Sequence, residues 1–245
     1  NLAGRESDAV LLWWALLMPA AYALPSVALI VLGWCGASVW FCMFVLDRTT
    51  WLGRDVYANA TLGAVAFGAV GVLVWALGSL HGDGEFHRAR RVIEQLGLLT
   101  ILIAMVPLGF LKQLGGWWIV GASTRLPAGV LVLLPPAAVA VGAAWLRFPP
   151  DRPIIRAGLA ASLLLVIVYL LVVTLKLVQQ TPESVYHMLG WTNWAILLVV
   201  ALALILCGAR WDRSAWINWG VIWIGVDAVA RYVELVGTML QASAL

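Results

Sequence analysis

Charged side chains are scarce in this chain of 245 residues, since Asp, Glu, Lys and Arg make up only 11% of it. A soluble domain carries about 25%, because charges cover the surface that faces water. Hydrophobic residues reach 63%, and the mean hydropathy is +0.97. These proportions exclude a water-soluble globule and a disordered chain, and they indicate an integral membrane protein. The net charge of +3 bears on membrane orientation, and we expect no nucleic-acid partner.

Cysteine and histidine are few, with three residues of each type. Cys35, Cys42 and Cys207 stand in apolar runs without metal-ligand spacing, which is typical of buried apolar thiols. The histidines show no paired pattern of the kind that ligates haem across a bundle. The sequence has no P-loop, no glycine-rich dinucleotide motif before a soluble αβ unit, and no usable Ser, His and Asp set. We therefore predict no catalytic residue, no cofactor and no enzyme activity, and we expect bound lipids.

Long apolar runs are what the sequence has in abundance. A helix needs about 20 apolar residues to cross a bilayer. None of the runs alternates with a period of two, and a backbone in lipid must satisfy its own hydrogen bonds. We therefore predict an all-α fold, a polytopic transmembrane bundle of about eight helices in one domain over residues 1–245, within a longer chain. The runs are 9–24, 27–46, 60–80, 96–111, 126–146, 157–177, 189–207 and a last one from about 215.

The segments between the runs predict the orientation. We expect a polar loop at 47–55, and the loop at 81–95 is the most charged. The segments that follow the first, third, fifth and seventh runs share one side. That side carries Arg88, Arg90, Arg91, Arg147, Arg152, Arg156, Arg210 and Arg213. The other side carries Arg5, Arg48, Arg54, Lys112, Arg125 and Lys176. The excess on the first side predicts that the 81–95 loop is cytoplasmic.

Three charged residues stand in the last run, at spacings that put them on one helical face: Asp227, Arg231 and Glu234. A charge in a membrane segment costs about 2.5–3.5 kcal/mol, so such residues are usually paired. Two interpretations stay open. The functional one is a proton or ion relay, or a clamp for a charged headgroup. The structural one is an ion-pair ladder near the membrane face, with Arg231 extending toward water.

The segment 81–87 contains four residues of types that bind divalent metals: His81, Asp83, Glu85 and His87. Their spacing matches no zinc, calcium or HExxH pattern. We interpret the segment as a solvated loop that leads into a basic stretch, and we predict no metal.

Small residues recur on one face of the third predicted helix: Ala60, Ala64, Gly68 and Gly71. This spacing lets helices approach closely. It predicts a packing face, either inside the molecule or between subunits. Asn193 and Asn218 are further candidates for hydrogen bonds between helices.

Tryptophan is abundant, with fifteen residues. Several stand at the ends of runs, where indole rings favour the headgroup layer. Trp75 and Trp223 are among those that lie deeper, where they either line a pigment or lipid site or fill packing space. Pro107 and the pair at 135–136 predict kinks in their helices.

Three blocks of sequence together resemble a known family. The first is SDAVLLWWALLMP at 7–19. The second is LGSLH at 77–81 with Phe86 and RVIEQLGLL at 91–99. The third is INWG at 217–220 with ARYVEL at 230–235. The combination is similar to the bacterial family of predicted membrane proteins called domain of unknown function twenty-one fifty-seven.

The resemblance implies a bacterial inner-membrane protein with further helices before and after this sequence. It implies that Asn218, Arg231 and Tyr232 belong to a family motif. The family has no established activity, so the resemblance implies no catalytic residue.

We predict a non-catalytic accessory or scaffold subunit, whose partners are lipids and other integral membrane proteins or further copies of the chain. The alternative is a transporter or lipid-handling protein that uses the charged face of the last helix. The sequence names no substrate, pigment or quinone.

Overall fold

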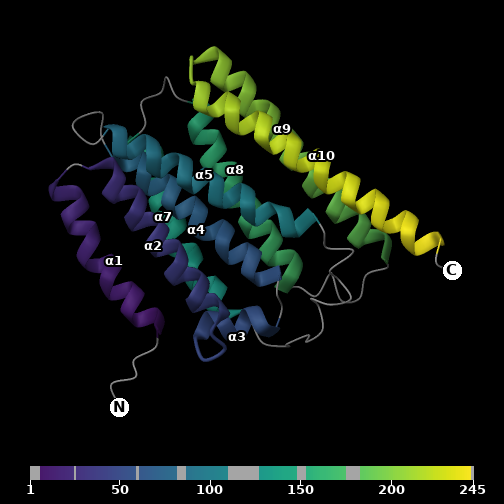
Figure 1. Cartoon of the computed structure of the whole chain (residues 1–245), viewed down its shortest axis with the longest axis horizontal. Helices are drawn as coiled ribbons and strands as arrows, with labels where there is room; N and C mark the ends of the chain where they lie inside the picture. The colour runs from purple at the N-terminus through teal and green to yellow at the C-terminus, as the bar shows by residue number, and fades with distance from the viewer. Residues whose placement is uncertain are drawn as a thin grey trace.

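The computed structural model of the chain describes residues 6–24, 26–58, 61–81, 87–109, 127–147, 153–174 and 183–243 (Figure 1). Within these ranges it contains nine α-helices and no β-strand, which confirms the predicted all-α fold. The helices are α1 (Glu6–Ala23), α2 (Val27–Leu46), α3 (Trp51–Ala58), α4 (Thr61–Leu80), α5 (His87–Gly109), α7 (Ala128–Arg147), α8 (Pro153–Thr174), α9 (Glu183–Arg210) and α10 (Ser214–Ser243).

Six helices are long and apolar enough to cross a membrane, so the chain is a multi-pass membrane protein. They correspond to the second to the seventh predicted runs, with ends that differ by up to seven residues. The apolar part of α1, Ser7–Ala23, is shorter. The last helix, α10, has 30 residues but is interrupted by the charged face. The six spans are Val27–Leu46, Thr61–Leu80, Ala89–Gly109, Ala128–Arg147, Pro153–Leu171 and Gly190–Arg210.

The helix α3 corrects the prediction of a polar loop at 47–55. Its charged residues do not keep it in solvent, because the helix has an apolar side on which Leu52 is fully buried. Asp55 binds inward: its Oδ2 accepts a 2.7 Å hydrogen bond from the backbone N–H of Gly129, in the first turn of α7. A charged residue that suggested a loop therefore caps another helix.

The predicted loop at 81–95 is also wrong in its second half, because α5 begins at His87 instead of at residue 96. Arg90 and Glu94 are one helical turn apart and form an ion pair, with 3.0 Å between Arg90 Nε and Glu94 Oε1. The pairing lets both charges enter the bundle, where Arg90 is 7% exposed and Glu94 is 6% exposed.

The helix α7 continues through the pair Pro135–Pro136 to Arg147 without interruption. The prolines face outward, where no neighbouring helix crowds them. The helix α9 begins at Glu183, where the sequence Thr-Pro-Glu at 181–183 predicts a helix start, and its polar first turns precede the apolar run at 189.

The centre of the bundle is α4, which packs against α5, α7 and α8. Its contact with α5 is backbone to backbone. A Cβ on Gly71 would lie 2.8 Å from Ile101 N, and a Cβ on Gly97 would lie 2.3 Å from Trp75 N. Glycine at these two positions is therefore what allows the two helices to approach so closely.

Two helix pairs flank this centre (Figure 1). The helix α1 packs mainly on α2, and α10 packs mainly on α9. A short turn joins α9 to α10, and its Asp212 has a positive φ of 51°. At Gly220 an added Cβ would lie 2.6 Å from Ala201 O, so α9 and α10 are in close contact.

The ends of α1, α4, α7 and α9 and the starts of α2, α5, α8 and α10 lie toward one end of the bundle (Figure 1). The Tyr22 hydroxyl near the end of α1 lies 2.9 Å from His81 Nε2, just after α4. The guanidinium carbon of Arg156 on α8 lies 5.7 Å from the ring centre of Trp145 on α7. We call this end the arginine-rich face, because it gathers Arg90, Arg91, Arg147, Arg156, Arg210 and Arg213.

Candidate functional site

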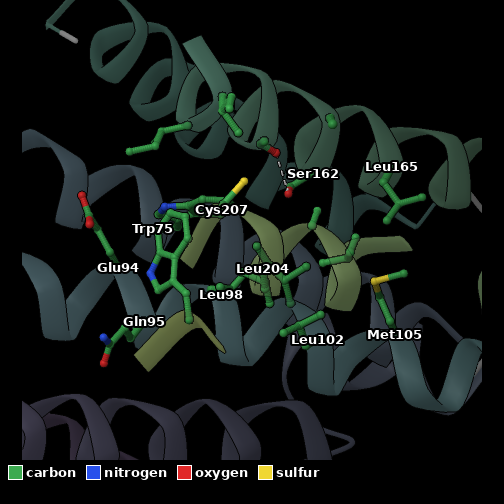
Figure 2. A pocket seen from close by; sticks show the side chains of 18 of the residues that line it. Trp75, Glu94, Gln95, Leu98, Leu102, Met105, Ser162, Leu165, Leu204 and Cys207 are labelled. Carbon is green, nitrogen blue, oxygen red and sulfur yellow. Dashed lines mark hydrogen bonds between the residues drawn. The ribbon is translucent and has the colours of Figure 1, made fainter. Parts of the chain in front are cut away.

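An apolar cavity of 330 Å³ lies among α4, α5, α8, α9 and the start of α10 (Figure 2). The side chains around it are almost all aliphatic or aromatic. Two of its polar side chains, Glu94 and Gln95, lie at the end nearer the arginine-rich face, whereas Ser162 stands further along α8. The lining residues are Trp75, Glu94, Gln95, Leu98, Ile101, Leu102, Met105, Ile154, Ile155, Gly158, Ala161, Ser162, Leu165, Ile196, Val200, Ala203, Leu204, Cys207 and Trp216.

The packing of the helices explains why the cavity exists. The helix α8 packs on α4 and α7, whereas α9 packs on α5 and α10. The cavity occupies the space between these two groups. Trp75 forms part of its wall, and a Cβ on Gly158 would lie 3.1 Å from the Trp75 ring. Ala161 and Ala203 line the cavity and are also exposed, so it reaches the outer surface between α8 and α9.

A layer of polar side chains lies beyond the deep end of the cavity. The Tyr169 hydroxyl donates a 2.6 Å hydrogen bond to Asn193 Oδ1, and Asn193 Nδ2 donates one of 2.8 Å to the carbonyl of Met105. Asn193 is fully buried. We call these residues the Asn193 bridge; it connects α5, α8 and α9, as expected for a hydrogen bond between membrane helices. Tyr169 and Asn193 stand about one turn beyond the lining residues Leu165 and Ile196.

A second, polar cavity of 500 Å³ adjoins the first at the arginine-rich face, and we call it the polar mouth. Glu94, Gln95, Ile155 and Trp216 line both cavities. The mouth adds two arginines, Arg91 and Arg213, together with Trp211, Asp212, Ser214 and Ala215. An apolar space and a polar space therefore meet at the level of Glu94.

The electrostatics of the polar mouth favour negative charge. The helices α5, α8 and α10 all begin beside it, and a helix N-terminus carries a partial positive charge. Glu94 is balanced by its ion pair with Arg90, and its Oε1 also lies 3.3 Å from Ser79 Oγ. Asp212 is then the one remaining acid beside Arg91 and Arg213 among the residues that line the mouth.

The predicted charged cluster lies elsewhere. Arg231 is hydrogen-bonded to Glu234, and its guanidinium carbon lies 3.9 Å from the ring centre of Trp191 and 4.9 Å from that of Trp194. These tryptophans stand in the first half of α9, toward the end opposite the arginine-rich face. The structure therefore brings Arg231 and Glu234 together, at a distance from both cavities.

Asp227 forms no hydrogen bond with this pair, although the charge of Arg231 one turn away acts on it. Its Oδ1 is buried and has no hydrogen-bond partner within the described part of the chain. Two residues of the motif implied by the resemblance face outward: Asn218 is exposed, and Tyr232 is 68% exposed. The outward position of these residues gives no support to a polar relay along α10.

The small-residue face lies inside the molecule where it is described. Ala64 is buried, Gly68 faces Val166 of α8 and Ala104 of α5, and Gly71 faces Ile101 of α5. Ala60 lies outside the described residues. This arrangement is packing between helices of one chain.

The histidine segment is only partly described. The ring of His81 contacts the Tyr22 hydroxyl and, through Nδ1, lies 2.8 Å from the Leu77 carbonyl. Asp83 and Glu85 lie outside the described residues, as does the side chain of His87. Over the ranges that are described, no three His, Cys, Asp or Glu side chains stand close enough to hold a metal ion. Cys35, Cys42 and Cys207 are free thiols, and Cys207 lines the apolar cavity.

Sequence reasoning missed both cavities and the roles of Glu94 and Arg91. The spacing of Arg90 and Glu94, one turn apart, was a signal that the basic stretch is helical. No pattern in the sequence predicts the cavity itself, because residues of five helices form it.

No protein-family model matches the chain, and no curated protein or solved structure matches it either. The resemblance to domain of unknown function twenty-one fifty-seven therefore stays a prediction.

Proposed function

We propose that this multi-pass membrane protein handles a membrane lipid, which it binds with an acyl chain in the apolar cavity. The observation that carries the proposal is the direct junction of the apolar cavity with the polar mouth. A lipid has the same two parts in the same order. The volume of 330 Å³ lies within the range of about 300–1,000 Å³ that ligand pockets occupy.

The route of entry supports a ligand that comes from the bilayer. Ala161 and Ala203 connect the cavity to the surface between α8 and α9. A lipid chain can enter sideways through this opening without leaving a hydrocarbon environment. The proposed role is binding, presentation or transfer of the lipid, with no covalent chemistry.

The proposal is tested by filling the cavity. Ala203→Phe places a ring in the cavity from α9, whereas Ala195→Phe places the same ring at an exposed position of α9 outside it. Native mass spectrometry of the protein released from nanodiscs counts the retained lipids. We expect Ala203→Phe to lower retention roughly tenfold, about 1.4 kcal/mol, because the ring occupies space that the acyl chain would fill.

Ala195→Phe is expected to retain lipid as the unchanged protein does. Equal retention by both variants would contradict lipid binding in this cavity. Thermal melting of each variant shows whether it is folded.

A second candidate, the accessory or scaffold subunit, is favoured by the outer surface of α10. This helix packs mainly on α9, and Val229, Val233 and Met239 are 63%, 57% and 62% exposed. Such a surface suits another membrane protein or a second copy of the chain. Gentle purification from native membranes followed by mass determination tests it: a stoichiometric complex is expected, and a lone chain would count against it.

A further inference from the structure

We propose that the lipid is anionic, and that its phosphate group is bound in the polar mouth between Arg91 and Arg213. The inference rests on the proposed function and adds the class of the ligand. It concerns the polar mouth alone, so it can fail while the apolar cavity still binds lipid.

The first step of the argument is that the acyl chain cannot supply the selectivity. In water, burial of a methylene group is strongly favourable, but a chain in a bilayer is already surrounded by hydrocarbon. Its transfer into the apolar cavity changes its surroundings little. The free energy that distinguishes one lipid from another must therefore come from contacts of the headgroup in the polar mouth.

The second step is the charge of the mouth. Arg91 is exposed on the second turn of α5, and Arg213 directly precedes α10. Glu94 is already neutralised by Arg90. Two guanidinium groups therefore face one acid, Asp212, among the side chains that line the mouth. Among these described lining residues the positive charges outnumber the negative ones, which suits a phosphate.

The third step is the geometry of the donors. Arginine presents several N–H groups in a planar fork that matches phosphate oxygens. The guanidinium carbon of Arg213 lies 5.0 Å from the ring centre of Trp216, which limits its orientations. The first turn of α10, from Ser214, adds backbone N–H groups beside it. Two arginines and the first turn of α10 thus line the polar cavity that adjoins the apolar one.

The experiment compares two lipids with identical chains, phosphatidylglycerol and phosphatidylcholine. The protein is exchanged into nanodiscs that contain equal amounts of both, and native mass spectrometry measures the ratio in which they are retained. We expect the protein to retain the anionic lipid about tenfold more strongly, equivalent to ~1.4 kcal/mol.

Variants of the two arginines test whether this lipid preference arises in the polar mouth. Arg91→Gln and Arg213→Gln are each expected to reduce the ratio several-fold, and the double variant is expected to bring it near one. Arg91→Lys is expected to retain part of the preference, because the charge remains but the planar fork is lost. The control is Arg147→Gln, which removes an exposed arginine from the same face outside both cavities and is expected to leave the ratio unchanged.

Failures of the two proposals give different results. If Ala203→Phe lowers lipid retention but the ratio is one, or is unaffected by Arg91→Gln and Arg213→Gln, the anionic headgroup site is wrong and the proposed function stands. If Ala203→Phe has no effect, the proposed function is wrong. Excess soluble glycerol phosphate separates a lipid site from a general phosphate site: displacement of the lipid by this probe would overturn binding of a lipid as such.

Discussion

Arg231 is the charged side chain with the most contacts on α10, since it binds Glu234 and lies against the rings of Trp191 and Trp194. A cation that faces an aromatic ring gains about 0.5–2 kcal/mol. The guanidinium thereby links α10 to α9 through the two tryptophan rings, whereas its ion pair with Glu234 lies within α10. Of the ion-pair ladder in the structural interpretation, the described residues of α10 form one pair, between Arg231 and Glu234.

Replacement of Arg231 tests that role. We expect Arg231→Gln to lower the free energy of unfolding in mixed micelles by about 1–3 kcal/mol, because the ion pair and both ring contacts are lost. Glu234→Gln removes only the ion pair and is expected to cost less. Arg210→Gln, at an exposed arginine on α9, is the control; an equal effect of Arg210→Gln and Arg231→Gln would contradict a role in joining the helices.

Replacement of Asp227, unlike that of Arg231, is not expected to destabilise the protein. Its buried Oδ1 lacks a hydrogen-bond partner in the part of the chain that is described, so Asp227→Asn removes a charge whose burial is costly. We expect the variant to be as stable as the unchanged protein or more stable, and to retain lipid equally. Loss of lipid to the extent seen with Ala203→Phe would show that the charged face takes part in function after all.

At the scale of the element, the contact between α4 and α5 depends on glycine. We expect Gly97→Ala to destabilise the protein by about 3 kcal/mol, because the methyl group would meet the backbone of Trp75 and the helices would have to separate. Gly225→Ala on α10 is the matched control, since nothing lies within 4 Å of an added Cβ there. Its free energy of unfolding is expected to rise by up to about 1 kcal/mol, because alanine has a higher helix propensity than glycine. Denaturant titration of both variants measures the contrast.

The short helix α3 gives a second prediction at this scale. Asp55→Ala is expected to cost about 0.5–2 kcal/mol and to speed hydrogen exchange in the first turn of α7, because the Gly129 N–H loses its acceptor. Asp55→Asn keeps an oxygen in the same place and is expected to restore most of the protection. Unchanged exchange in Asp55→Ala would show that the cap does not hold the start of α7.

Particular elements show what the sequence could predict and what it could not. The apolar runs predicted all six spans, because hydrophobic length alone decides which helices cross a bilayer. The runs could not predict α3 or the start of α5, since charged residues there bind inside the molecule: Asp55 to Gly129, and Glu94 to Arg90. The sequence could not predict the cavity, because the cavity depends on the relative positions of α8 and α9. The residue composition of either helix does not determine those positions.

At the scale of the whole molecule, the helix hairpins gather arginines at one end. We expect this arginine-rich face to be cytoplasmic, because short loops rich in Lys and Arg stay on that side. In a chain whose three native cysteines are replaced by alanine, Arg210→Cys should resist a membrane-impermeant maleimide added to intact cells. Asp47→Cys, between α2 and α3, should react. The reverse pattern would show the opposite orientation.

The Asn193 bridge has a consequence for where the lipid comes from. Glu94 and Met105 mark the two ends of the cavity along α5, and at 1.5 Å per residue they are about 16 Å apart. That depth is about half of the ~30 Å hydrocarbon core. With Tyr169, Asn193 and the Met105 carbonyl lying beyond its floor, we expect a lipid that binds as proposed to come from a single leaflet. Movement of a headgroup to the other leaflet would require these hydrogen bonds to break.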